Sequence, residues 1–269
     1  MLQRVRELSV QSANATNSQS DRDALNAEVT QLVSEIDRVA NQTNFNGTKL
    51  LDGSFAGALF QVGANSGQTI AVNSIVDANA NALGKAQFAA ATTSTAAVAG
   101  GTATATGSYA GMAINGVTVD DVKVGIGDTG ADVSKKLAAA INDKMDQTGV
   151  YASLDSTNKL TLTSLTAGKD LTFTAGTLTG GTGITMAEAG IAAGTAAAGS
   201  TKYIKDLNIS SFTGAQQAME IVDKALTSVN SARADMGAVQ NRFTSTIANL
   251  QATGENLSAS RSRIRDADY

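Results

Sequence analysis

Hydrophobic side chains recur with helical spacing at both ends of the chain. In the back segment they follow a 4-3 alternation over about six heptads, which is typical of a long helix in coiled-coil-like packing. The rungs of this ladder are Val222, Leu226, Val229, Met236, Phe243, Ile247, Leu250, Leu257 and Ile264. The spacing predicts one helix over residues 215–265, with these apolar side chains buried inside their own subunit.

The front segment shows the same alternation in a shorter form. Its rungs are Leu25, Val29, Leu32, Ile36 and Val39. Ser20 and Asp23 have the spacing of a capping box at the start of this helix. The stretch "NATNSQS" separates it from an earlier helix that carries Leu2, Val5 and Leu8. The front of the chain is therefore predicted to be helix, turn, helix.

Neither terminal helix shows the usual end signals. Only a methionine precedes Leu2, whereas helices normally begin with Ser, Thr, Asp or Asn, and the final "SRIRDADY" contains no glycine cap. We interpret the chain as a truncated fragment of a helical bundle that continued further at both ends.

The middle of the chain is predicted to be rich in β-strands. Asn46-Gly47 and Asp52-Gly53 are turn pairs typical of hairpins, and "ALFQVG" and "QTIAVN" alternate like short strands. Residues 111–176 form a β-α-β module: strands "MAINGVTV" and "VKVGI", helix "ADVSKKLAAAINDKM", then strands "VYASLD", "KLTLTSL" and "DLTFTA". Residues 89–108 and 176–200 are rich in Ala, Gly and Thr, and we expect loops or poorly packed connectors there.

The distribution of arginine separates the two ends from the middle. Every arginine lies at or before Arg38 or at or after Arg233, and every cation between them is lysine. This favours a discontinuous domain, 1–94 with 201–269, that carries an insertion at 95–200. The expected fold class is α+β: an elongated, discontinuous α-helical rod with β-hairpins, built as a coiled-coil-like bundle from both termini, plus an inserted β-rich outer domain.

Composition excludes several function classes. The chain has no Cys, His, Pro or Trp, which removes the usual ligands of zinc and haem and the Ser-His and Cys-His catalytic pairs. A net charge of −4 and an aromatic content of 4% argue against nucleic acid. No apolar run has the length of a membrane helix. We therefore expect no enzyme activity, no cofactor, no metal and no membrane or nucleic-acid partner.

A few motifs leave ligand-binding alternatives open. Gly125, Gly127 and Gly130 form a literal G-x-G-x-x-G between a strand and a helix, as in dinucleotide sites. Thr129 and Asp132 in the same stretch have the spacing of an ordinary capping box, and the preceding strand is not continuously apolar. A plain strand, turn and helix is the favoured interpretation.

Acidic residues raise three further possibilities. Asp77, Asn79 and Asn81 are spaced like the start of a calcium loop, but Ala82 and Phe88 stand where Gly and Glu are needed. A second cation site would use Asp120, Asp121 and Asp128. An acid/base pair would come from Asp143, Asp146 and Asp155. Exposed carboxylates are the default for all of these residues.

The two ends also carry long motifs that identify a family. "LQRVRELSVQSAN", "EIDRVANQTNFNGTKLLDG", "SARADMGAVQNRFTSTIANL" and "ENLSASRSRIRDADY" closely resemble bacterial flagellin, over residues 1 to about 60 and about 205 to 269. The module at 111–176 resembles one seen in flagellin insertions and hook-associated proteins. The resemblance implies a secreted structural subunit of the extracellular flagellar filament that serves motility and lacks the terminal filament-core helices. A fragment of this kind is not expected to assemble readily alone.

The resemblance also implies partners and contact residues. The partners are other flagellin subunits in a helical homopolymer, an export chaperone and hook-associated proteins. Helical spacing and an antiparallel turn bring Arg4, Leu8 and Glu28 to one patch, and these match motif positions of flagellins sensed by Toll-like receptor 5. The expected receptor or subunit interface consists of Arg4, Glu7, Leu8, Gln11, Glu28, Arg233 and Arg242. The alternative is a flagellin-like surface protein that binds glycans or mediates adhesion through its outer domain.

Overall fold

The computed structural model describes residues 1–269 except 56, 64–65, 74, 95–98, 186–193 and 267–269. It comprises two units, Met1–Leu32 with Gly84–Lys224, and Val33–Leu83 with Ala225–Tyr269. The boundaries expected from composition, 94/95 and 200/201, both fall inside the first unit and remain a prediction.

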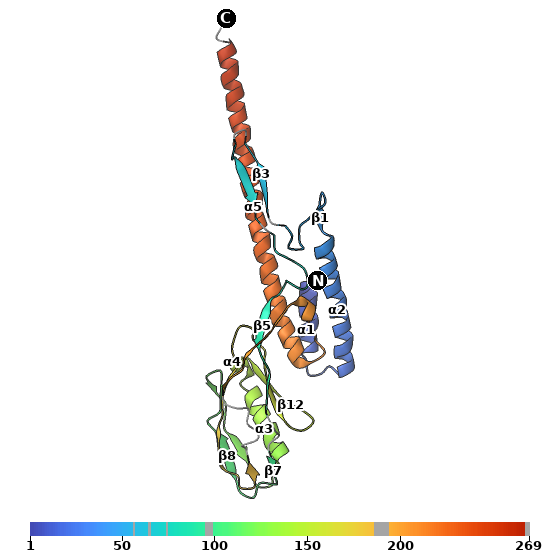
Figure 1. The fold of residues 1–269 in the computed structure, drawn as a ribbon, viewed down its shortest axis with the longest axis vertical. Coiled ribbons are helices and arrows are strands. Elements are labelled where there is room, and N and C mark those ends of the chain that lie inside the picture. Colours follow the sequence, from blue (N-terminus) through green and yellow to red (C-terminus); the bar gives the residue numbers. More distant parts are fainter. Residues whose placement is uncertain (56, 64–65, 74, 95–98, 186–193, 267–269) are drawn as a thin grey trace. The chain divides into compact units, whose positions relative to one another are not determined.

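Helices occupy both ends of the chain and one part of the middle (Figure 1). They are α1 (Leu2–Ser12), α2 (Gln19–Gln42), α3 (Gly130–Asn142), α4 (Met145–Thr148), the 3-10 helix η1 (Ile204–Asp206) and α5 (Phe212–Asp266). The long helix predicted over 215–265 is confirmed, and so is the front helix, turn and helix.

Short antiparallel strands fill the rest of the described chain. They are β1 (Asn44–Phe45), β2 (Thr48–Lys49), β3 (Ala58–Gln61), β4 (Thr69–Val72), β5 (Ala86–Ala89), β6 (Thr92–Thr93), β7 (Ala99–Gly100), β8 (Gly107–Ala110), β9 (Ala113–Ile114), β10 (Val117–Thr118), β11 (Val122–Val124), β12 (Val150–Leu154), β13 (Leu160–Ser164), β14 (Thr172–Thr174), β15 (Thr177–Gly180), β16 (Ile184–Thr185), β17 (Gly194–Thr195) and β18 (Ala198–Lys202). The predicted α+β class is confirmed.

In the first unit, the insertion has its own hydrophobic core. Helix α3 places Val133, Leu137 and Ile141 on one buried stripe, spaced four residues apart, and this helix packs on β12. Ile114 of β9 and Leu162 of β13 are fully buried in the same cluster. Each such side chain contributes about 1.5–3 kcal/mol on burial.

Three small sheets surround this core, and they correct one prediction. Their strand orders are β10-β9-β14-β17, β11-β8-β15 and β12-β13-β6. Strands β6 and β15 lie in the stretches 89–108 and 176–200, which were expected to be connectors, and β8 begins at the end of the first stretch. The expectation was wrong for the described parts. Backbone groups need hydrogen-bond partners whatever the side chains are, and antiparallel pairing of β8 with β11 and β15 supplies them even where the side chains are small. Residues 95–98 and 186–193 lie outside the described residues.

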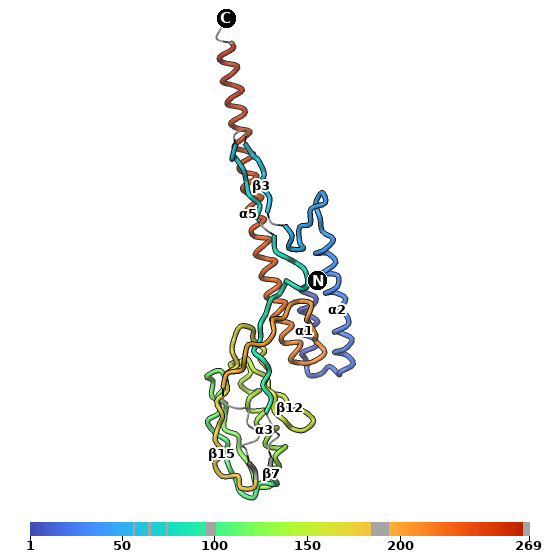
Figure 2. Tube along the Cα trace, viewed as in Figure 1, coloured from blue at the N-terminus to red at the C-terminus, as the bar shows by residue number. Residues whose placement is uncertain are grey.

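Two strands carry the chain into and out of the insertion. Strands β5 and β18 pair antiparallel, with Ala89 opposite Ala198 and Ala86 opposite Lys202. Figure 2 shows the two passes of the chain running together at this point.

The same unit contains the contact between the terminal helices. Helix α1 lies beside the first part of α5 and the first turns of α2 (Figure 1). Val5 and Leu8 of α1, Val29 of α2, and Ile221 and Val222 of α5 are all buried. The apolar stripes predicted at both ends of the chain therefore meet in a core here.

The start of α2 corrects a second prediction. The Ser18 hydroxyl accepts the Asp21 N–H at 3.2 Å, and the Asp21 carboxylate accepts the Ser18 N–H at 3.0 Å. This is the reciprocal pattern of a capping box. The predicted pair, Ser20 and Asp23, lies two residues too late, and the Asp23 carboxylate instead accepts a hydrogen bond from the Gln19 side chain at 2.9 Å.

The second unit contains two hairpins and most of α5. Strands β1 and β2 pair through the turn Asn46-Gly47, and β3 pairs with β4. The Phe60 ring of β3 meets the Phe243 ring of α5 edge to face, with centroids 5.6 Å apart. Such a pair contributes about 0.5–1.5 kcal/mol beyond the area it buries.

The far part of α5 corrects a third prediction. Ile247, Leu250, Leu257 and Ile264 are 42–74% exposed, although the ladder was expected to be buried within its own subunit. The expectation holds for Val222 but is wrong for these four rungs. The repeat marks a side of the helix that favours apolar contact, and the described residues cover that side at Val222 and contact it at Phe243 but leave these four positions exposed.

Candidate interaction site

Charged side chains from α1 and α2 form a compact cluster on the first unit. The Arg4 Nε group donates to the Glu28 carboxylate at 2.8 Å, and Arg4 Nη1 lies 3.4 Å from the Glu7 carboxylate. The hydrogen bond and charge of Glu28 raise the pKa of the Arg4 guanidinium above its ordinary value. The predicted convergence of Arg4 and Glu28 is confirmed. We call the exposed surface of Arg4, Glu7 and Glu28 the Arg4 face.

Leu8 occupies a different environment from the charges beside it. Its side chain is fully buried, whereas those of Arg4, Glu7 and Glu28 are 50%, 67% and 44% exposed. The expectation that Leu8 shares the exposed patch with Arg4 and Glu28 is wrong, because the Leu8 side chain belongs to the buried side of α1 and offers no surface to a partner. Gln11, one turn further along α1, is exposed.

The remaining predicted interface residues belong to the second unit. Arg233 and Arg242 are both exposed on α5. Arg242 lines a groove of about 530 Å³ between residues 72–73 and 75–76 on one side and α5 on the other, together with Ile75, Met236 and Val239. The structure thus places Arg233 and Arg242 in a unit separate from the Arg4 face.

Several polar contacts that sequence reasoning missed hold α1 and α2 in place. Arg6 Nε donates to the Asp223 carboxylate of α5 at 2.7 Å. The Ser12 hydroxyl donates to the Ile209 carbonyl oxygen, and the Asn26 side-chain oxygen accepts the Ile209 N–H at 2.8 Å. These pairs join residues 183 to 217 positions apart in the chain, so no local motif could have indicated them.

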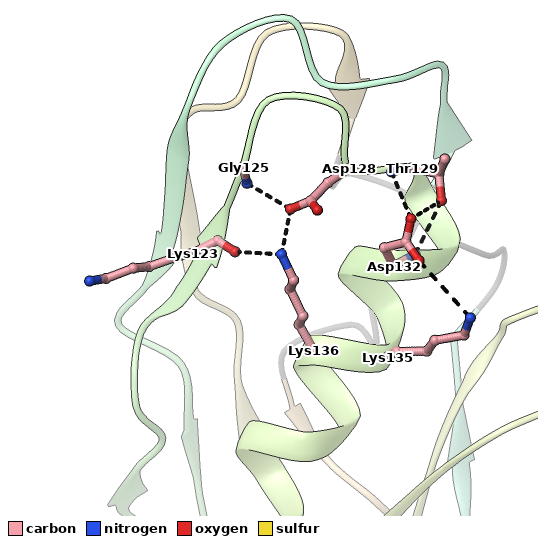
Figure 3. Close-up of polar contacts among 7 residues, drawn as sticks. All are labelled: Lys123, Gly125, Asp128, Thr129, Asp132, Lys135 and Lys136. Carbon is pink, nitrogen blue, oxygen red and sulfur yellow. Dashed lines mark hydrogen bonds and ion pairs between the residues drawn. The ribbon is translucent and has the colours of Figure 1, made fainter.

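The G-x-G-x-x-G stretch is an ordinary loop and helix cap. The Thr129 hydroxyl accepts the Asp132 N–H and the Asp132 carboxylate accepts the Thr129 N–H, which confirms the predicted capping box (Figure 3). The Asp128 carboxylate accepts the Gly125 N–H at 2.6 Å and pairs with Lys136 at 2.6 Å. Carboxylates of the chain thus bind two N–H groups of this loop, those of Gly125 and Thr129, where a phosphate site would leave such donors for its ligand.

The acidic motifs are likewise engaged in local structure. Asp120 pairs with Lys144 at 3.3 Å, and the Asp77 carboxylate accepts the Asn79 N–H at 3.0 Å. The Asp155 carboxylate accepts hydrogen bonds from the Thr157 hydroxyl and from the N–H groups of Thr157 and Lys159. These bonds, the hydroxyl bond most of all, lower the pKa of Asp155. Each of these three carboxylates thus binds an N–H or ammonium group of the chain itself.

Within the described ranges, no three His, Cys, Asp or Glu side chains are grouped closely enough to hold a metal ion. No helix in the part of the chain that the structure describes is both long and apolar enough to cross a membrane.

The aromatic side chains of the insertion are not free platforms for a sugar. Phe173 is buried, Tyr109 is half-buried, and the Tyr151 ring lies 4.8 Å from the Phe212 ring. Together, the packed terminal helices and the β-rich insertion define an α+β protein, and the exposed charges of the Arg4 face are its candidate contact surface.

Family comparisons agree with this class along most of the chain. Residues 1–56 match the bacterial flagellin N-terminal helical region and residues 219–269 the C-terminal helical region. Residues 103–166 match the flagellin hook IN motif, which overlaps the β-α-β module predicted at 111–176.

Individual relatives match the whole chain. Flagellin B of Vibrio anguillarum is 36% identical over 270 residues, and Flagellin C of Vibrio cholerae is 38% identical over 277 residues. Each alignment covers 100% of this chain and 67% of the relative. Among solved structures, FliC from Burkholderia pseudomallei aligns over 90% of this chain and 92% of its own, with 29% identity and a TM-score of 0.48. A hook-associated protein-3 from Legionella pneumophila aligns over 98% and 88%, with 16% identity and a TM-score of 0.48.

The chain belongs to the bacterial flagellin family. It is a structural subunit of the extracellular flagellar filament, not an enzyme, and its family polymerises through contacts between subunits.

Proposed function

We propose that the Arg4 face is a protein-docking surface, which contacts a neighbouring subunit in the filament and binds Toll-like receptor 5 when the subunit is free. The observation that carries this proposal is the 2.8 Å pair between Arg4 of α1 and Glu28 of α2, held with both side chains about half exposed. The Arg4, Leu8 and Glu28 pattern of receptor-sensed flagellins supports the choice of receptor.

The chemistry of this pair suits recognition better than stability. An ion pair in contact with water contributes little to folding. The planar guanidinium, however, has five N–H donors in a fixed fork. Among the described residues, Arg4 uses Nε for Glu28 and Nη1 for Glu7, so Nη2 and the second Glu28 oxygen remain available to a partner.

Leu8 and Gln11 have distinct roles in this proposal. Leu8 is fully buried and anchors α1 in the core, so it positions Arg4 without touching the partner. Gln11 is exposed and extends the same side of α1 by two helical turns from Arg4.

The direct test measures binding of the folded chain to the soluble receptor ectodomain. Arg4→Ala and Glu28→Ala should each weaken binding at least about tenfold, as expected for a contact residue of an interface. Arg38→Ala is the matched control, because Arg38 is 54% exposed and also ion-paired, but with Glu35 of its own helix α2; the affinity of this variant should stay unchanged. Unchanged affinity in both test variants would refute the docking role of the Arg4 face.

A charge-swapped chain separates recognition from local structure. Arg4→Glu combined with Glu28→Arg restores an internal ion pair with its charges exchanged. If the partner reads the charges, binding stays weak in the double variant. Recovery of wild-type affinity would mean that the pair only shapes the helices and would contradict the proposal.

We assign Arg233 and Arg242 to contacts between subunits. Arg242 borders the groove lined by Ile75 and Met236, which gives a neighbouring chain both an apolar floor and a cation. In the polymerising protein, Arg242→Ala should lower the fraction of subunits that sediment as filament. Sedimentation equal to that of the unmodified protein would remove Arg242 from the interface.

A further inference from the structure

Two Asn-Gly turns share one backbone conformation. Asn46 and Gly47 have φ of +48° and +81°, and Asn115 and Gly116 have φ of +52° and +80°. Both pairs close a two-residue hairpin, β1–β2 in the first case and β9–β10 in the second. This is the turn that favours Asn-Gly, since both positions need positive φ. The two turns nevertheless differ in everything around them.

The Asn115 side chain is held at both ends. Its amide nitrogen donates to the Thr148 carbonyl oxygen at 2.8 Å, and its amide oxygen accepts the Thr172 N–H at 2.8 Å. Its own backbone N–H donates to the Thr172 carbonyl oxygen at 2.9 Å. The neighbouring Ile114 is fully buried, and β9 pairs with β14 as well as with β10. Moving Asn115 therefore disrupts a sheet and its core.

The Asn46 side chain has no such restraint. It is exposed, and among the described residues it has no hydrogen-bond partner. Strands β1 and β2 form a sheet of only two strands, with the register Asn44 to Lys49 and Phe45 to Thr48. The Phe45 side chain is 75% exposed. A hairpin this short and uncovered is marginal in water and opens at little cost.

From this contrast, we propose that Asn46 is a site of spontaneous deamidation and that Asn115, with the same sequence motif, is protected. The Gly47 backbone nitrogen loses its proton to hydroxide or water and attacks Cγ of Asn46, forming a new C–N bond. The Cγ–Nδ2 bond breaks and the nitrogen leaves as ammonia, which takes up a proton. Water then opens the five-membered imide at either carbonyl and yields aspartate or isoaspartate. The sum is Asn plus water giving Asp or isoAsp plus ammonia, with no oxidant or reductant.

Hairpin opening controls the rate of this reaction. The closed turn fixes the Asn46 backbone, whereas the ring closes only after rotation brings the Gly47 nitrogen towards Cγ. Glycine permits that rotation because it has no Cβ. The rate therefore scales with the population of the open hairpin, which is high for β1–β2 and low for β9–β10.

The product changes the hairpin in two ways. Either form adds one negative charge at the turn. The isoaspartyl form also adds a backbone carbon, which breaks the register between Phe45 and Thr48. The modified subunit is therefore expected to lose the β1–β2 pairing and leave the rest of the fold intact.

Peptide mapping by mass spectrometry tests the proposal, on the full chain incubated in mildly alkaline buffer. Loss of the amide at Asn46 should proceed at least about tenfold faster than at Asn115, because Asn115 reacts only from an open state of the sheet. The same chain in denaturing urea is the matched control, and there the two rates should converge. Isoaspartate should appear in the peptide containing Asn46.

Further outcomes are equally decisive. An Asn46→Gln variant should lose the fast modification and keep the slow one, because the six-membered imide of glutamine forms much less readily. Equal rates at the two asparagines in the folded chain would overturn the proposal. So would an Asn46 that stays intact in the folded chain while it reacts in urea.

Discussion

Replacing Leu8 by alanine tests whether α1 is packed as the structure has it. Leu8 is fully buried, and the buried side chains of the same unit include Val5, Val29 and Val222. Leu→Ala at such sites costs about 2.7–5 kcal/mol, of which about 1.5–3 kcal/mol is lost transfer free energy and the rest is the cavity left behind. We expect a loss of about 3–4 kcal/mol in the stability of the first unit.

Hydrogen exchange of α1 peptides, followed by mass spectrometry, is the appropriate assay. Two units need not unfold in one transition, so a single global midpoint would blur the effect. A loss of about 3 kcal/mol should speed exchange in α1 by about a hundredfold, since each 1.4 kcal/mol is a factor of about ten. Val10→Ala is the control on the same helix, because Val10 is 49% exposed and its truncation should change stability by less than about 0.5 kcal/mol.

The comparison of these two variants decides the matter. If Leu8→Ala and Val10→Ala accelerate exchange equally, Leu8 is not buried in solution and the packing of α1 is refuted. Leu8→Met keeps the volume and should cost less than about 1.5 kcal/mol. In the proposed docking role, this variant should also retain receptor binding, because Leu8 only positions Arg4.

Two further predictions concern stability. Gly84→Ala should destabilise the first unit by about 2–4 kcal/mol, because the new Cβ would lie 2.7 Å from the Ile221 carbonyl oxygen at a φ of +76°. Gly237→Ala meets nothing within 4 Å and should stabilise the second unit by about 0.5–1 kcal/mol. Hydrogen exchange of peptides from each unit measures the two effects separately, and a change of the same sign in both variants would contradict this reasoning. Hydrogen bonds from the Thr129 hydroxyl and N–H hold the pKa of Asp132 below its ordinary value of 3.8. The stabilisation is therefore complete above that value and lost as the pH falls through the lowered folded pKa. Asp132→Asn should flatten the acid limb of stability measured by hydrogen exchange in α3, and an unchanged slope would count against the cap.

Local signals predicted most of the elements. The 4-3 ladder predicted a helix over 215–265, and the observed helix is Phe212–Asp266. Thr129 and Asp132 predicted a capping box, which is confirmed. These signals work because helix periodicity and capping depend on residues three or four positions apart. The cap of α2 was misplaced by two residues because several Ser and Asp residues offer the same spacing there.

The candidate site was only partly predictable. Helical spacing and an antiparallel turn were enough to bring Arg4 and Glu28 together, and their 2.8 Å contact confirms this. The pairing of Arg6 with Asp223 was not predictable, because Asp223 lies on α5, more than 200 residues away in the chain. The apolar spacing of α1 predicted a packed side that includes Leu8, but not that Leu8 is buried completely.

By itself, the sequence determined the helical ends, the β-rich middle and the motifs of the flagellin family, since each of these depends on side chains close together in the chain. Only the tertiary structure decided which of two identical Asn-Gly turns is held and which is free. It also decided that Val222 is buried while Ile264, on the same ladder, is 74% exposed. Burial is a property of what surrounds a residue in space, and the same local pattern serves equally for a covered position and an open one.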